Sequence, residues 1–285
     1  MGNVMLGFPN RIDDGALSGG SWQASLPLNN LKNRVQAKVA RSTSAVLAST
    51  TFDVDLGATK IIRVLGLCNH NFSLAARVRV RASAVPSFAA LDYDSGWVDV
   101  WPRIYGTDYL DWEDERWWSG AYSDEEKAGY SWLYTAILPF NTVSRYWRVE
   151  INDTTNPAGY VQLGRVFIGS VWQPEHSMSF GHTIAWETST SVQAALSDSE
   201  YFTVKNPLRV VHFNVDWLSE NQALESVFEI QRRAGIDKEV LFIHDPDETI
   251  HQLRRRFVGR FRQLNSIEHP SVVQHGAAFE IKETQ

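Results

Sequence analysis

The sequence predicts a mainly β protein with two antiparallel β-sandwich domains, the second of which carries one flanking α-helix. Short apolar or alternating runs, separated by turn residues and without helical crossovers, recur along the chain. Aromatic residues reach 12%, with 11 tryptophans, and such a content is typical of heavy β-sheet cores. A length of 285 residues exceeds what one hydrophobic core usually organises, which favours two domains.

The first half of the chain contains five strand-like runs. Residues 51–56 and 76–81 alternate with a period of two, which indicates strands with one buried face. Residues 61–67 are mostly apolar, as in a strand buried on both faces. Residues 145–151 and 160–168 follow, with turn residues between them. We therefore expect a jelly-roll sandwich over residues 1–172.

The second half combines strands with the best helix of the chain. Its strand-like runs cover residues 178–187, 201–204, 208–215, 238–244, 256–267 and 277–282. Ser219 is a good N-cap, Gln222 completes a capping box, and Gly235 ends the helix. Its apolar stripe is predicted to comprise Leu224, Val227 and Phe228. These elements predict a sandwich plus helix over residues 173–285.

An acidic, aromatic insertion over residues 92–130 interrupts the first domain. Residues 92–126 hold eleven acidic residues, two arginines and five tryptophans without a clean period. Such aromatic content argues against disorder, so we expect an ordered loop. The candidate contact residues for a ligand or partner are Trp112, Trp117, Trp118, Asp111 and Glu113.

Three interpretations of this insertion stay open. The plainest is a solvated acidic loop whose aromatic rings pack against the sandwich. The second is contact with a sugar or a partner protein, since indole rings stack on both. The third is glycan cleavage within residues 108–126, where acid–base work would need two carboxylates. The carboxylates available for it are Asp111, Glu113, Asp114 and Glu115.

A cluster of five cations lies near the C-terminus, with no acidic residue from 249 to 267. It consists of Arg254, Arg255, Arg256, Arg260 and Arg262. Contact with phosphates is one interpretation. The formal net charge of −6 argues against nucleic acid, so we expect no specific nucleic-acid binding and favour an interface with a neighbouring subunit or element.

The remaining motifs favour a non-catalytic protein without metal or cofactor. Phosphate-loop, dinucleotide-binding, metalloprotease and nucleophile-elbow motifs are missing from the sequence. A single cysteine, Cys68, allows neither an internal disulfide nor a cysteine-based zinc site. His244, Asp245 and Asp247 fit a turn better than a metal site. We expect neither a membrane span nor a signal peptide, and therefore synthesis in a cytoplasm.

The strand motifs of the first half resemble the galactose-binding-like jelly rolls of the discoidin type. The resemblance rests on the strand that ends in Asp55, Leu56 and Gly57, and on residues 62–67, 145–151 and 161–169. It covers about residues 40–170 and implies a jelly roll whose variable loops bind ligands. The chain departs from that pattern in the insertion and in lacking a disulfide, and no ligand-binding residue is carried over.

The whole arrangement resembles structural proteins at the tail tip of long-tailed phages. The motifs that carry this resemblance are residues 69–71, 257–260 and 279–283. The second domain is similar to the ring-forming module of tail-tube and distal tail proteins. The resemblance implies a virion protein of the tail tip or baseplate, made in the host cytoplasm. It implies a ring, expected to be a hexamer, that joins the tail tube to the hub or fibres. A host-surface glycan is a further expected contact of the first domain. A glycan-binding or glycan-cleaving protein is the alternative.

Overall fold

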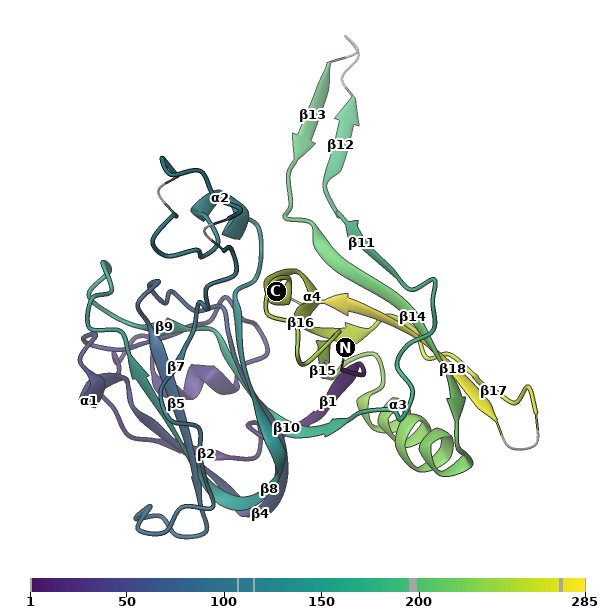
Figure 1. The fold of residues 1–285 in the computed structure, drawn as a ribbon, viewed down its shortest axis with the longest axis horizontal. Helices are drawn as coiled ribbons and strands as arrows, with labels where there is room; N and C mark the ends of the chain where they lie inside the picture. The colour runs from purple at the N-terminus through teal and green to yellow at the C-terminus, as the bar shows by residue number, and fades with distance from the viewer. Residues whose placement is uncertain (1, 107, 115, 195–198, 272–273, 285) are drawn as a thin grey trace.

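The computed structural model describes residues 2–106, 108–114, 116–194, 199–271 and 274–284. Within these residues, one antiparallel sheet of 14 strands runs through the molecule, two short ribbons lie off it, and one helix of 13 residues flanks it (Figure 1). The predicted fold class, mainly β with antiparallel sandwich packing and one helix, is confirmed. None of the described helices is long and apolar enough to span a membrane.

The first module, for which we keep the predicted name jelly roll, is an antiparallel β module whose strands follow the order β10-β4-β8-β5-β6. The predicted strands 51–56 and 61–67 belong to one long strand, β4, whose register against β8 shifts between Asp55 and Lys60. The core gathers around Trp147, which is fully buried. The elements are β2 (Ala16–Ser18), η1 (Leu28–Lys32), β3 (Ala40–Arg41), α1 (Leu47–Thr50), β4 (Phe52–Cys68), β5 (Arg77–Ser83), β6 (Tyr93–Asp94), β7 (Val98–Asp99), α2 (Asp124–Lys127), β8 (Leu133–Asn152), β9 (Gln162–Leu163) and β10 (Arg165–Trp172).

The second module continues the same sheet in the order β11-β14-β18-β16-β15. Its core is built from phenylalanine rings, and Phe213 stacks on Phe279 with 5.1 Å between ring centroids. The elements are β11 (Thr183–Glu187), β12 (Ser191–Ala194), β13 (Glu200–Thr203), β14 (Leu208–Leu218), η2 (Gln222–Phe228), α3 (Glu229–Ala234), β15 (Glu239–Ile243), α4 (Gln252–Arg255), β16 (Arg256–Phe261), β17 (Ile267–Glu268) and β18 (His275–Glu283).

The helix begins where the capping residue predicts, but its apolar stripe is displaced. The Ser219 hydroxyl accepts a hydrogen bond from the amide of Gln222 at 3.3 Å. Val227 is buried against the sheet as predicted, whereas Leu224 and Phe228 are exposed. The η2 segment is wound with π-type hydrogen bonds, which span five residues instead of four. The prediction assumes 3.6 residues per turn. It therefore places Leu224 and Phe228 on the buried face, although both lie at the surface.

The first strand, β1 (Met5–Asn10), lies at the centre of the molecule. One of its edges pairs with β10 of the jelly roll and the other with β15 of the second module. Leu6 and Phe8 are buried in the second core, while Met5 joins a cluster packed between the two modules. The division into residues 1–172 and 173–285 stays a prediction. The structure adds that β1 packs with both halves.

A buried arginine ties the two modules together at the same junction. Arg165 on β10 is fully buried, and its Nε donates to Glu239 on β15 at 3.0 Å. Its terminal nitrogen also donates to Asp13 at 2.6 Å. Because an unpaired charge in a core is costly, loss of any one of these three side chains should destabilise the folded state.

We predict that Arg165→Met destabilises the fold by about 3–5 kcal/mol, because it leaves Glu239 buried without its cation. Urea unfolding followed by circular dichroism measures the change in unfolding free energy. Arg232→Met is the control, since Arg232 and Glu229 form a solvent-exposed pair that contributes little to stability. Equal unfolding free energies for the two variants would contradict the role given to Arg165.

Candidate functional site

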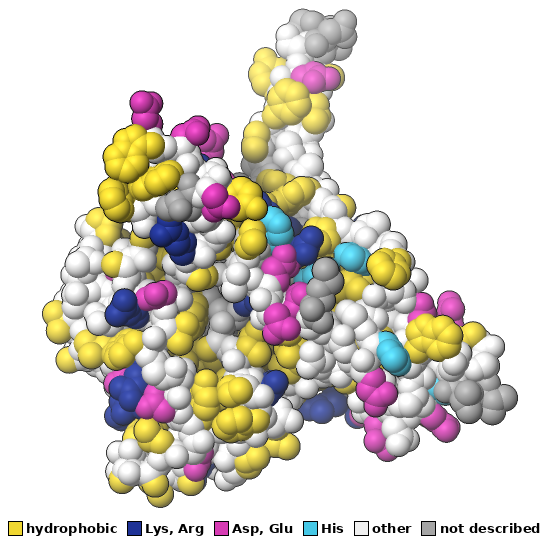
Figure 2. All heavy atoms as spheres, viewed as in Figure 1, with side chains coloured by type: hydrophobic (Ala, Val, Ile, Leu, Met, Phe, Trp, Pro, Cys, Tyr) yellow, Lys and Arg dark blue, Asp and Glu magenta, His cyan; other side chains and the backbone are white. Residues whose placement is uncertain are grey.

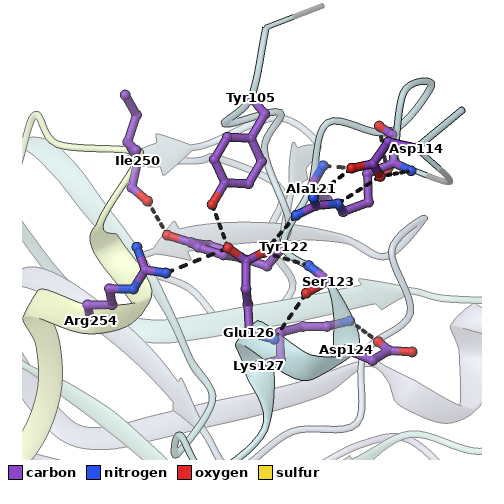
Figure 3. Close-up of polar contacts among 12 residues, drawn as sticks. Tyr105, Asp114, Ala121, Tyr122, Ser123, Asp124, Glu126, Lys127, Ile250 and Arg254 are labelled. Atoms are coloured by element: carbon purple, nitrogen blue, oxygen red, sulfur yellow. Dashed lines mark hydrogen bonds and ion pairs between the residues drawn. The ribbon is translucent and has the colours of Figure 1, made fainter. Parts of the chain in front are cut away.

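The acidic insertion is an ordered subdomain that includes the short helix α2. Ser123 caps this helix: its hydroxyl accepts from the amide of Glu126, whose carboxylate in turn accepts from the amide of Ser123 (Figure 3). This reciprocal pair satisfies two amide groups that a helix N-terminus otherwise leaves without partners. The insertion therefore has a defined shape despite lacking a periodic sequence pattern.

An arginine binds two of the acidic side chains together. Arg116 donates to Asp114 at 2.7 Å and to Glu126 at 3.0 Å. The hydroxyl of Tyr105 donates to the same Glu126 carboxylate at 2.6 Å (Figure 3). Hydrogen bonds from Arg116 lower the pKa of Asp114 to about 2. Burial raises the pKa of Glu126, but hydrogen bonds from Tyr105 and Ser123 outweigh it and lower that pKa. Both carboxylates are therefore ionised at neutral pH.

The insertion lies against the second module as well as the first. The hydroxyl of Tyr122 donates to the backbone oxygen of Ile250, and Arg254 lies 3.6 Å from Glu126 (Figure 3). The ring of Tyr130 meets the ring of Trp186 on β11, with 5.4 Å between centroids. The insertion thus bridges the jelly roll and the second module.

The predicted contact tryptophans come together as one exposed aromatic cluster. Trp112 and Trp118 are 71% and 81% exposed, and their rings meet in a T-shaped arrangement with 6.3 Å between centroids. Trp117 is half-buried and packs on Trp112 at 5.6 Å. Asp111 and Glu113 are exposed beside them in the chain. The role of these five residues in contacting a ligand or partner stays a prediction.

An open groove of about 590 Å³ begins beside this cluster. Trp118 and the half-buried Trp101 line it together with the polar side chains of Arg77, Asp99 and Asn152. Arg77 Nε donates to Asp99 at 2.8 Å, so these two charges are already paired. Indole surface next to hydrogen-bonding groups is what a sugar or an extended peptide needs from a binding site.

The structure gives the glycan-cleavage alternative little support. A general acid needs a raised pKa, yet the pKa values of Asp114 and Glu126 are lowered and both carboxylates are bound to Arg116. Asp111 and Glu113 lie exposed to solvent. Glu115, the fourth candidate, lies outside the described residues.

The predicted arginine cluster is bonded within its own chain. Arg255 pairs with Glu248, and Arg262 pairs with Glu280 at 2.7 Å. Arg254 reaches Glu126 of the insertion, as described above. Arg256 is buried and Arg260 donates to a backbone oxygen. The arginines thus contact neighbouring elements of their own chain, whereas contact with another subunit stays a prediction.

The segment around His244 forms a turn. The amide of Asp247 donates to the side chain of Asp245 at 2.9 Å, as in a side-chain-stabilised turn. Among the described residues, no three His, Cys, Asp or Glu side chains lie close enough to hold a metal ion.

Sequence reasoning missed the most prominent surface of the molecule, a ribbon that we call the arm. It comprises residues 183–194 and 199–207 and projects away from the body (Figure 1). Val192 and Phe202 face each other across its two strands and are 53% and 58% exposed, and Tyr201 is 66% exposed. Figure 2 shows hydrophobic side chains along the projecting arm. The only available signal was an apolar run at 201–204 between polar, sparsely charged segments.

No protein-family model and no curated protein matches the sequence. Among solved structures, the chain is similar to the CBM32-1 module from a family 31 glycoside hydrolase of Clostridium perfringens. The identity is 13%, the match covers 57% of this chain and 99% of that chain, and the TM-score is 0.35.

Two further solved structures match this chain with similar identity, coverage and TM-score. The family 32 module of Clostridium perfringens NanJ, in complex with galactose, is 9% identical over 58% of this chain and 99% of that chain, with a TM-score of 0.37. A Streptococcus pneumoniae fucose binding module is 13% identical over 56% and 94%, with a TM-score of 0.36.

We predict that acid loosens the insertion through Arg116. Because pairing with Arg116 depresses the pKa of Asp114, it stabilises the loop above the ordinary carboxyl pKa of about 4. That stabilisation is lost as the pH falls towards about 2. Tryptophan fluorescence, recorded from about pH 5 to about pH 2, should report this transition.

In Arg116→Gln the acid transition of the insertion should disappear, and its spectrum near neutral pH should resemble that of the acidified wild type. Arg103→Gln is the control, because Arg103 donates to the backbone oxygens of Tyr105 and Trp117 and to no carboxylate among the described residues. A titration curve of Arg116→Gln identical to that of the wild type would rule out the ion pair as its cause.

Proposed function

We propose that this protein is a non-catalytic structural protein of a phage tail tip, and that copies of it assemble into a ring through the arm. The ring joins the tail tube to the hub or fibres, and the resemblance noted in the sequence implies six copies. The exposed apolar arm is the observation that carries the assembly part of this proposal. The tail-tip location rests on the sequence resemblance.

The arm cannot be explained as a free-standing element. An isolated two-stranded ribbon is at best marginally stable in water, and one with large exposed apolar side chains invites association. Val192 and Phe202 are cross-strand partners, whereas Tyr201 pairs with Gln193 and so faces the other side of the ribbon. Both faces of the arm therefore carry apolar surface. A second protein surface that covers the arm would stabilise it.

The composition of the arm fits a contact between proteins. Its described residues include only three charged ones, Glu187, Glu200 and Lys205. The centre of an interface is typically depleted of charge and enriched in aromatic residues. Each large apolar side chain that becomes buried contributes about 1.5–3 kcal/mol. Covering the arm therefore favours self-association.

We predict that Val192→Ser with Phe202→Ser, the arm variant, weakens self-association by roughly 100-fold, because two apolar side chains lose their cover. Analytical ultracentrifugation of the full chain over a range of concentrations measures this. The control is Ile61→Ser with Val143→Ser, an equally exposed cross-strand pair on the jelly roll. A wild type that stays monomeric throughout would refute the self-assembly proposal.

The location at a tail tip is tested separately. Three-dimensional reconstruction of the phage particle should place a ring of this chain between the tail tube and the hub. Mass spectrometry of purified particles should find the chain among their components. Density elsewhere in the particle, or absence of the chain from it, would contradict the virion role and leave self-assembly intact.

Glycan contact by the jelly roll is a second candidate function, and one observation favours it. The groove beside the tryptophan cluster combines the exposed ring of Trp118 with the polar groups of Arg77, Asp99 and Asn152. Carbohydrate recognition combines ring stacking with a few directed hydrogen bonds in a concave site. A ring at a tail tip that displays such grooves outward would present several copies to a host-surface glycan.

We predict that Trp118→Ala abolishes glycan binding on an array, because the stacking surface of the groove is lost. Trp97→Ala is the matched control: Trp97 is also exposed, at 40%, and does not line the groove. Retention of binding by the control with loss in Trp118→Ala supports the candidate. No binding by the wild type, or equal binding by both variants, would exclude it.

A further inference from the structure

The second module carries another bare apolar surface, which we call the helix face: Trp217, Leu224 and Phe228. Leu224 and Phe228 lie four residues apart on η2 and are 42% and 53% exposed. Trp217 lies just before the helix and is 62% exposed. Ala223 and Val227 supply the side that packs on the sheet. A helix that is apolar on two sides is typical of one covered on both, and its own chain covers only one.

The backbone at Trp217 is strained. Its φ is +63°, a left-handed conformation that costs a bulky residue roughly 1–2 kcal/mol. The residue lies in a bulge where the register of β14 against β18 shifts between Val215 and Leu218. Bulges re-aim side chains, and here the result is an indole left in solvent. Strain retained to display a tryptophan points to a contact, because tryptophan is the residue most enriched at binding hot spots.

The arm and the helix face lie at opposite ends of the same strand. β14 begins at Leu208, where the arm ends, and finishes at Leu218, directly before the helix. Its 11 residues span roughly 35 Å. β11 pairs with the first part of β14 and leads the arm away from the helix (Figure 1). An arm directed this way does not cover the helix face of its own chain.

We propose that the arm of one copy packs on the helix face of the next copy, so that subunits associate head to tail. This rests on the self-assembly proposed above and names the surface that receives the arm. Both surfaces are apolar at the centre. The arm carries Glu200 and Lys205 in exposed positions, and Lys205 can pair with Glu220 or Glu225, which are exposed beside the helix face.

Head-to-tail contact has a consequence for the size of the assembly. Each copy uses one arm and one helix face, so every added copy offers the same free surfaces again. Such an interface closes into a ring when the rotation between neighbours fits, whereas two arms pairing with each other would stop at a dimer. A ring therefore needs no contact beyond this pair of surfaces, provided that the rotation between neighbours closes it; otherwise the same contact gives an open filament.

Mixing two inactive variants tests the pairing of surfaces. The arm variant keeps its helix face, and the face variant, Leu224→Ser with Phe228→Ser, keeps its arm. Each alone should be monomeric at concentrations where the wild type assembles. Mixed in equal amounts, they should form a dimer with one copy of each and nothing larger, measured by native mass spectrometry with one variant tagged.

The variant Trp217→Gly distinguishes a role of Trp217 in contact between copies from a role in folding. Glycine adopts the left-handed conformation without strain, so the variant should unfold at the same or a higher urea concentration than the wild type. The lost indole should nevertheless weaken self-association by about tenfold or more. A tryptophan that served only the fold would show the opposite pattern: destabilisation with unchanged assembly.

The possible results distinguish this inference from the proposed function. Assembly of the face variant and of Trp217→Gly as strong as that of the wild type would overturn the inference while self-assembly through the arm stands. A mixture that stays monomeric would also overturn it, because an intact arm and an intact helix face would then be present without binding each other. A wild type that never assembles refutes the proposed function itself.

Discussion

The architecture depends on one strand with two paired edges. Because β1 is hydrogen-bonded to β10 on one side and to β15 on the other, the jelly roll and the second module share a single sheet. Arg165 and Glu239 join the same two strands by a buried ion pair, and an apolar cluster fills the space between the modules. The position of the jelly-roll surfaces relative to those of the second module follows from this junction.

Charge in this protein serves mainly to position segments. The acidic insertion and the arginine cluster, far apart in the chain, meet where Glu126 lies beside Arg254. Arg116 gathers two carboxylates inside the insertion, and Arg255 and Arg262 pair with acids of their own module. Since these charges bind one another, the large unsatisfied surfaces that we describe are apolar: the tryptophan cluster, the arm and the helix face.

Two of these surfaces lie at the two ends of β14, and this placement connects the fold with assembly. The strand is part of a core that needs no partner, because Phe213 and Val215 are buried in it. Its continuation at one end is a bare ribbon and at the other a strained tryptophan followed by a bare helix face. A chain with a complete core can thus still expose apolar surface. The hydrophobic effect then favours burial of that surface against other copies.

The strands at residues 76–81 and 145–151 and the cap at Ser219 were predictable from sequence, because alternation and capping are local patterns. The sequence also located the aromatic insertion. Only the tertiary structure decided that Trp147 is buried while Trp118 is exposed, that β1 belongs to both modules, and that the arginines pair within the chain. Burial and pairing depend on which distant segments meet, and a pattern of neighbouring residues carries no record of that.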